Sequence, residues 1–390
     1  MEQSENFNGL KMMQFEAQCH FELIMHLISN CFQQKRIPEY GCESGLRSFV
    51  ASGYQLDASV FLYEAIKLLE GILPEQITVL KNEKEYLDLK VVRNNIHTFS
   101  KCGGFSKKAE CITNEKRTEY KLDTPDWLFP LRNDISLVFE IVDGSRHFIG
   151  SDYFISHCLF ESNNRKWNGL EYKKFASYVS SHIKALAIST DETLYELTPL
   201  NAPKIMPQIE LFDFKSADLY AIAKVSNSVA FRLILILHQI SYGILLTEKL
   251  IDRSSIEKSD LWTCFFTKQL AIKYDESIDN LQSILRFSEM SDQKVLSSTL
   301  ENCGVILPEL KARGFSQSLR NTIHYQRTNL DVNKITDITT KDYLVAIYLS
   351  NSDVYTMEDF KQKAQEITQE LRALQAALQK IFPLNKEYKK

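Results

Sequence analysis

The sequence predicts a mainly α fold built from two helical bundles. The chain of 390 residues holds only 13 glycines and 9 prolines, whereas β-rich proteins use many of these residues in turns. Hydrophobic residues make up 44% and charged residues 25% of the chain, which is typical of a soluble globular protein. Several segments also repeat apolar residues at the 3.6-residue period of a helix. At about 150 residues per domain, the length predicts roughly two to three domains.

In the N-terminal half, the apolar spacing predicts helices over residues 10–34, 57–71 and 83–101. Asp57 is the expected N-cap of the second helix, and Gly71 is expected to end it shortly before Pro74. The region 135–160 is different, because an apolar, β-branched run is followed by the turn pair Asp143-Gly144 and by a second apolar run. This pattern predicts either two helices or a small hairpin or irregular insertion.

The best linker lies at residues 191–214. It contains Pro199, Pro203 and Pro207 and shows no helical period, and Ser216 directly after it is a suitable N-cap. The sequence therefore predicts an N-terminal helical domain over 1–190 and a C-terminal helical domain over 215–390.

The C-terminal half contains the most apolar stretch of the chain, Val229–Leu246. Arg232 and His238 lie inside it, and a charged side chain at the centre of a bilayer is costly, so a buried core helix is favoured over a membrane span. We expect no membrane association. The predicted helices of this half span 216–252, 260–289, 306–328, 340–350 and 356–382.

The last of these helices carries an apolar seam at spacings of four and three residues. Its members are Phe360, Ala364, Ile367, Leu371, Leu374, Leu378 and Ile381. The pattern favours one face of a bundle within the chain, because bundles use the same spacing as coiled coils. The alternative is a surface over 356–382 that binds a second copy or a partner protein.

Cysteine usage and charge narrow the class of protein further. The eight cysteines form no CxxC pair and no signal peptide is recognisable, so we expect reduced thiols, a cytoplasmic location, and neither a metal site nor a cofactor. Neither GxGxxG nor GxxxxGK[ST] occurs, which argues against Rossmann and P-loop enzymes. The net charge of −4 gives no overall nucleic-acid signature, so any such function depends on local patches.

One short pattern occurs twice. Motif one is Arg93-Asn94-Asn95-Ile96-His97, and motif two is Arg320-Asn321-Thr322-Ile323-His324, identical at four of five positions. Both lie in predicted helices, where residues four apart project from the same face.

Arginine and histidine on one face suit metal-independent cleavage of RNA. Histidine transfers protons near neutral pH while the RNA 2′-hydroxyl attacks the neighbouring phosphate, and arginine binds the phosphate oxygens through two donors. The predicted catalytic residues are Arg93, Asn94, His97, Arg320, Asn321 and His324.

Basic and aromatic residues near both motifs predict local RNA binding. The predicted RNA-binding residues are Lys101, Lys107 and Lys108 after motif one, and Arg313, Tyr325 and Arg327 around motif two. The expected partner is single-stranded or tRNA-like RNA. If one phosphate meets both motifs, the two motifs lie within about 20 Å of each other, or else a symmetric homodimer pairs like motifs.

The two motifs resemble those of the HEPN superfamily, helical-bundle proteins that include toxin, antiphage and CRISPR-associated ribonucleases. Arg93-Asn94 and Arg320-Asn321 match the start of the family motif, and His97 and His324 match its end. Three residues separate Arg from His here, whereas the family usually has four to six. The resemblance implies two HEPN-like bundles and a metal-independent endoribonuclease of a toxin or antiphage defence system, whose two motifs form one composite cleft.

Two other interpretations remain open at this stage. The chain is alternatively a non-catalytic scaffold or regulatory module, in which the same bundles bind a partner protein. His147, His157 and Cys158 also suggest a Cys/His nucleophile pair, although an apolar run of this kind more often indicates buried packing.

Overall fold

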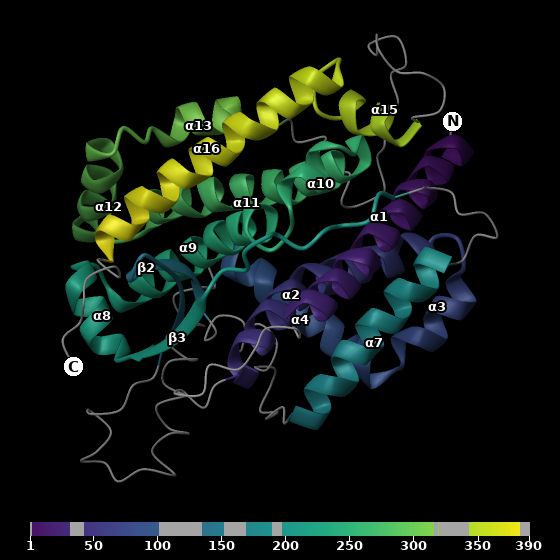
Figure 1. Cartoon of the computed structure of the whole chain (residues 1–390), viewed down its shortest axis with the longest axis horizontal. Helices are drawn as coiled ribbons and strands as arrows, with labels where there is room; N and C mark the ends of the chain where they lie inside the picture. Colours follow the sequence, from purple (N-terminus) through teal and green to yellow (C-terminus); the bar gives the residue numbers. More distant parts are fainter. Residues whose placement is uncertain are drawn as a thin grey trace.

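The computed structural model describes residues 2–31, 43–100, 135–151, 169–188, 197–315, 319 and 343–382. The fold is mainly α, as predicted: the described residues form thirteen helices and one three-stranded sheet (Figure 1). The helices are α1 (Glu2–Cys31), α2 (Glu43–Glu70), α3 (Pro74–Lys81), α4 (Lys84–Ser100), α7 (Gly169–Ile188), α8 (Ser216–Ala223), α9 (Asn227–Glu248), α10 (Arg253–Glu257), α11 (Asp260–Phe287), α12 (Met290–Asn302), α13 (Leu307–Arg313), α15 (Tyr343–Ser350) and α16 (Met357–Ile381). The strands are β1 (Ile135–Val142), β2 (Ser145–Ser151) and β3 (Ile209–Phe214).

The second helix begins earlier than its local signal predicts. Asp57 was expected to cap it, but α2 starts at Glu43 and Asp57 lies in its interior, so that prediction is wrong. The Asp57 carboxylate instead accepts hydrogen bonds from Lys273 Nζ of α11 at 2.9 and 3.0 Å. A distant cation therefore satisfies the group that looked like a cap. The short helix α3, which Pro74 starts at its first turn, was not predicted.

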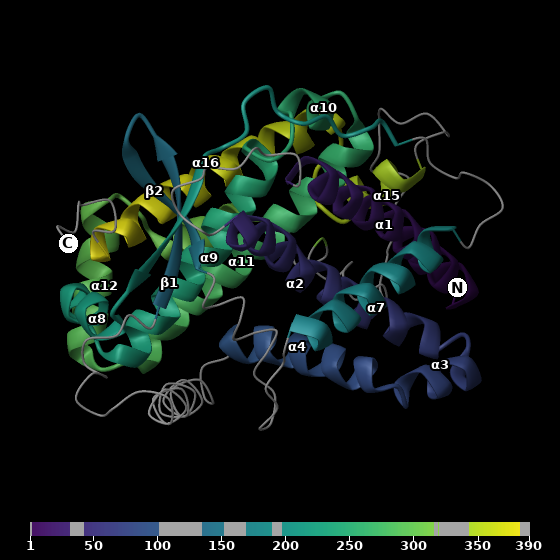
Figure 2. The same cartoon turned by 60° about the horizontal axis from the view of Figure 1, so that its bottom comes forward.

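A hairpin forms at Asp143-Gly144, so the strand interpretation is confirmed for residues 135–151, while 152–160 lie outside the described residues. Asp143 and Gly144 both have positive φ, at 50° and 75°, which is the conformation of a tight turn between antiparallel strands. Strands β1 and β2 pair antiparallel on either side of the turn. Figure 2 shows the hairpin beside α9, and β2 contacts that helix.

The end of the predicted linker is a strand. Residues 209–214 form β3, which pairs antiparallel with β1 and gives the sheet order β2-β1-β3. The linker prediction is therefore wrong over these six residues, because their apolar side chains pack onto the sheet: the rings of Phe139 and Phe212 lie 5.6 Å apart. Residues 197–208 of the predicted linker have neither helix nor strand.

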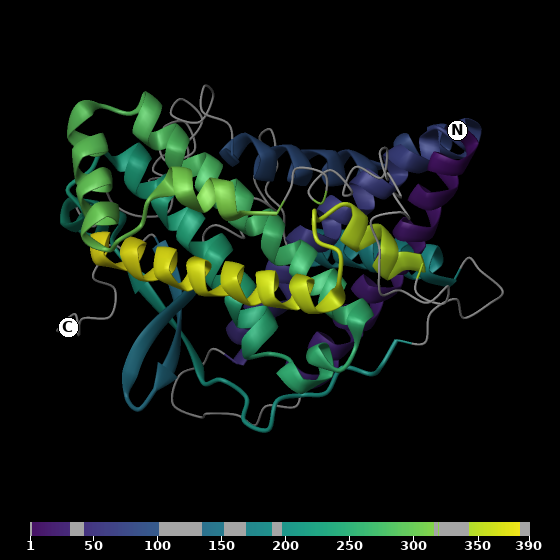
Figure 3. The ribbon, with the colours of Figure 1, turned by 90° about the horizontal axis from the view of Figure 1, so that it is seen from above.

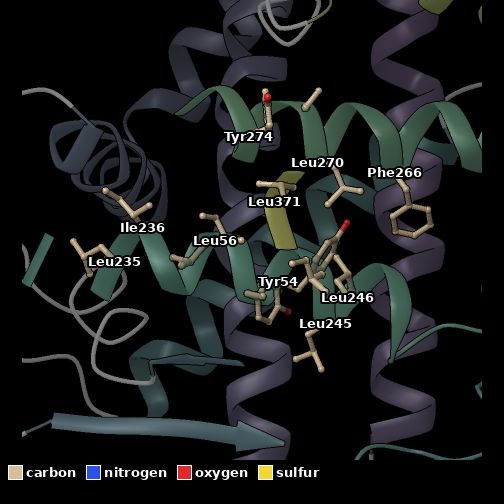
Figure 4. Packing of buried hydrophobic residues seen from close by; sticks show 14 of the residues in the cluster. Tyr54, Leu56, Leu235, Ile236, Leu245, Leu246, Phe266, Leu270, Tyr274 and Leu371 are labelled. Atoms are coloured by element: carbon tan, nitrogen blue, oxygen red, sulfur yellow. The ribbon is translucent and has the colours of Figure 1, made fainter. Parts of the chain in front are cut away.

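The halves before and after this segment share one core. Buried side chains of α1, α2 and α4 belong to the same hydrophobic cluster as those of α9, α11 and α16. Figure 4 shows the part of this cluster where α2 meets α9, α11 and α16. Tyr242 of α9, for example, donates a hydrogen bond of 2.8 Å to the carbonyl of Val50 in α2. The division into two folding domains stays a prediction, but the two halves pack against each other directly.

The apolar stretch at 229–246 lies in a core helix. By length and composition α9 passes for a membrane span, with a mean hydropathy of 1.8, yet 94% of that stretch is buried inside the protein. Arg232 and His238 inside it have protein partners: Arg232 donates to Asn280 Oδ1 at 2.8 Å, and His238 Nδ1 accepts from the Ser151 N–H at 2.9 Å. The helix predicted over 216–252 is broken before α9, where Lys224 adopts a left-handed conformation.

A buried ion pair joins the two halves inside the core. Glu16 of α1 forms an ion pair with Lys268 of α11 and accepts a hydrogen bond of 2.9 Å from the hydroxyl of Tyr348 in α15. Glu16 and Lys268 are 2% and 1% exposed, so water does not screen the pair. Burial lowers the pKa of the Lys268 ammonium from its ordinary value, and Glu16 partly offsets that effect.

The apolar seam of the last helix faces its own chain. Phe360, Ile367, Leu371 and Leu374 are almost fully buried, and α16 contacts α9, α11 and α12. Figure 3 shows α16, in yellow, running across the C-terminal half. The seam therefore serves the intramolecular bundle, which leaves the polar face of 356–382 for any partner protein.

Candidate functional site

Motif one lies on α4, and its arginine is already oriented. Arg93 Nε and Nη2 both lie 3.2 Å from Oε1 of Glu64 on α2, and the guanidinium lies 5.5 Å from the ring centre of Tyr63. The Arg93 side chain is 20% exposed, whereas Glu64 is 5% exposed. Within the described chain, Nη1 of Arg93 has no hydrogen-bond partner. A held arginine with a spare pair of donors suits the binding of a phosphate oxygen.

The other residues of motif one follow on the same helix. Asn94 is exposed. His97 lies one turn after Arg93 on α4, and its side chain is outside the described residues. The helical prediction for motif one, over 83–101, is thus confirmed by α4.

Motif two, Arg320, Asn321 and His324, lies outside the described residues, but the chain up to Phe315 and the single residue Leu319 before the motif are described. Helix α13 ends at Arg313, so the helix predicted over 306–328 is shorter in its described part. The ring of Phe315 lies 5.3 Å from that of Phe360 on α16, and Leu319, directly before the motif, is fully buried. The entry to motif two is therefore anchored in the core.

The two motif-bearing regions share a neighbour. Helix α4 contacts α11, and so does α13, which precedes motif two. Figure 2 shows α4 along the lower edge of the molecule, with α11 above one end of it. Helix α4, which carries motif one, and helix α13, which precedes motif two, thus both lie against α11.

Of the predicted RNA-binding residues, the structure describes Arg313 alone. Lys101, Lys107, Lys108, Tyr325 and Arg327 lie outside the described residues. Arg313 is 61% exposed and forms ion pairs with Glu309 at 2.8 Å and Glu370 at 3.3 Å. These two carboxylates reduce the positive charge that Arg313 offers to a phosphate.

The sequence did not point to Glu64 or to the acidic and aromatic groups near motif one. Burial, and to a lesser extent Glu85 and Glu171, raises the pKa of Asp88 to about 6. Burial also raises the pKa of Tyr86, whose ring stacks on that of Tyr63, to about 12. Glu64 lies 29 positions before Arg93 on another helix, so no local spacing identifies the pair.

The described part of the chain gives little support for other chemistry. His147 is exposed on β2, while His157 and Cys158 lie outside the described residues. Burial raises the pKa of the Cys19 thiol far above its ordinary value, which keeps it protonated and unreactive. The described residues contain no group of three His, Cys, Asp or Glu side chains that would hold a metal ion.

Comparison with known proteins adds no relative. No protein-family model matches the chain, and no curated protein or solved structure matches it either.

Proposed function

We propose that this protein is a metal-independent endoribonuclease in which motif one and motif two act on one phosphodiester. The observation that carries the proposal is the position of motif one: Arg93 is fixed by Glu64, and it lies on a helix that contacts α11 together with α13, the helix before motif two. The repeated motif and its resemblance to HEPN ribonucleases supply the chemistry.

In this mechanism the two residue types have different roles. Arg93 and Arg320 hold the non-bridging phosphate oxygens and stabilise the charge that develops there. His97 and His324 remove the proton from the 2′-hydroxyl and protonate the leaving 5′-oxygen. The 2′-oxygen forms a bond to phosphorus as the bond to the 5′-oxygen breaks, which leaves a 2′,3′-cyclic phosphate. Toxin or antiphage defence is the setting that the resemblance suggests.

Glu64 acts through Arg93 as a positioning residue. Its carboxylate fixes the Nε edge of the guanidinium and leaves Nη1 directed to other partners. Asn94, exposed beside Arg93, extends the polar surface that faces RNA.

The test is cleavage of single-stranded RNA and of a tRNA pool by the purified protein in EDTA. The expected products end in a 2′,3′-cyclic phosphate, and His324→Ala and His97→Ala are each expected to lower the rate by about 10²- to 10⁴-fold. Arg93→Lys keeps the charge but loses the planar fork, so it is expected to lower the rate at least about tenfold.

The matched control is His147→Ala, which removes an exposed histidine of the β-hairpin and is expected to leave cleavage unchanged. An absolute requirement for a divalent ion, or full activity in His324→Ala, contradicts the proposal. The non-catalytic interaction module is then the remaining interpretation.

A further inference from the structure

An open cleft lies in the C-terminal half between the end of α9, α10, the first half of α11 and the first half of α16. Its volume is about 120 Å³. Its apolar wall is formed by Ile256, Phe266, Leu270 and Ala364. Figure 4 shows Phe266 and Leu270 on neighbouring turns of α11. An apolar cavity of about 150 Å³ takes up benzene, so this cleft has room for about one ring.

Four threonines from three helices give the cleft its hydroxyl groups. Thr247, Thr263 and Thr368 each donate their hydroxyl proton to a backbone carbonyl, at 3.0, 3.1 and 2.8 Å. Their oxygens still have lone pairs that accept a hydrogen bond.

Thr267 differs from the other three. It is 4% exposed, yet its hydroxyl makes no hydrogen bond to any residue that the structure describes. Because Thr267 lines the cleft, this hydroxyl is free to hydrogen-bond to water or to a ligand there. Thr267 therefore supplies a donor in a cleft whose other hydroxyls act as acceptors.

The charges at the rim are already paired. Arg253 binds Glu257 at 2.7 Å, Lys361 binds Asp260 at 2.7 Å, and Glu248 binds Arg372. No lining charge is left to neutralise a charged ligand, and an ion in the cleft would lose water without gaining a counter-ion. The cleft therefore favours a neutral occupant.

We infer that this cleft is a binding site for a small neutral molecule: one ring in size, mainly apolar, and carrying a hydroxyl or carboxamide group. The ring lies against Phe266 and Leu270, and the polar group exchanges hydrogen bonds with Thr267 and the neighbouring threonine oxygens. The inference rests on the cleft alone and is independent of the proposed ribonuclease activity.

The test is saturation-transfer NMR on the whole protein with benzyl alcohol, benzamide, toluene and benzoate as probes. Benzyl alcohol and benzamide are expected to bind with a Kd on the order of 1 mM. Thr267→Val, which keeps the shape and removes the hydroxyl, is expected to weaken both about fivefold to tenfold and to leave toluene binding unchanged. Benzoate is expected to bind at least about tenfold more weakly than benzyl alcohol.

Two blocking variants and one control complete the experiment. Ala364→Phe fills the cleft, and Gln365→Trp covers it from an exposed position, so each is expected to abolish binding of every probe. Thr299→Val removes the hydroxyl of a helical threonine on α12, outside the cleft, and is expected to leave binding of every probe unchanged. Absence of binding to the wild-type protein, binding that survives both blocking variants, or tighter binding of benzoate overturns the inference.

Discussion

Replacing Lys268 by methionine is expected to destabilise the protein more than any loss of a surface charge. The substitution keeps the length of the side chain but leaves the carboxylate of Glu16 buried without its cation. Both side chains are at most 2% exposed, so solvent does not compensate for the loss. Removing one partner of such a pair typically costs about 3–5 kcal/mol. Equilibrium urea unfolding followed by far-UV circular dichroism measures this change.

The double variant Glu16→Gln/Lys268→Met separates the charge from the packing. Glutamine is neutral and still accepts the hydrogen bond from Tyr348, so the double variant is expected to lie within about 1 kcal/mol of the wild type. Lys361→Met, which breaks the exposed pair with Asp260, is the control and is expected to cost about 0–1 kcal/mol. A cost below about 1 kcal/mol for Lys268→Met, or a double variant as unstable as the sum of its single changes, refutes the reasoning.

Three further predictions concern burial. Burial, and secondarily a nearby lysine, lowers the pKa of His20 and of His238 from 6.5 to about 3, so only the unfolded chain takes up these protons below pH 6.5. As the pH falls from about 6 to 3, each histidine therefore lowers the free energy of unfolding by about 1.4 kcal/mol per pH unit. His20→Phe is expected to reduce this pH dependence of the free energy of unfolding, measured by urea titrations at several pH values. Asp88 is destabilising when it is charged, because its pKa is raised to about 6 in the fold. Asp88→Asn is therefore expected to stabilise the protein at pH 7 by up to about 3 kcal/mol. An equal gain in stability at pH 3.5, where the Asp88 carboxyl of the fold is protonated, contradicts this. Gly150→Ala would place its Cβ 2.5 Å from Cζ of Phe49, so a loss of about 1–3 kcal/mol is expected, and an unchanged melting temperature contradicts that contact.

The fold was predictable where local signals agreed with the packing. The helices around motif one and along α16 follow their apolar spacing, and Asp143-Gly144 marks a real turn. The prediction failed where a distant residue decides the outcome. Asp57 resembles a cap but pairs with Lys273, 216 positions away, and β3 is a strand because β1 lies beside it.

The candidate site was predictable only in part, for the same reason. A repeated pentapeptide is visible in the sequence, and it identified Arg93 and its helical face. The neighbour that orients Arg93 is Glu64 on a different helix, and the cleft that Thr267 lines depends on how four helices meet. Neither feature has a spacing that a single sequence reveals.

The pairing of Glu16 also constrains how the protein is made. Its two partners lie 252 and 332 positions later in the chain, so they are synthesised only after more than half of the polypeptide. At about 5–20 residues per second, translation leaves α1 without these partners for roughly 10–70 s. During that time a helix that includes the apolar side chains of Phe15 and Leu23 has not reached its final environment. The newly made helix therefore keeps these apolar side chains uncovered during synthesis, and a ribosome stalled before Tyr348 yields a chain that lacks a partner of Glu16.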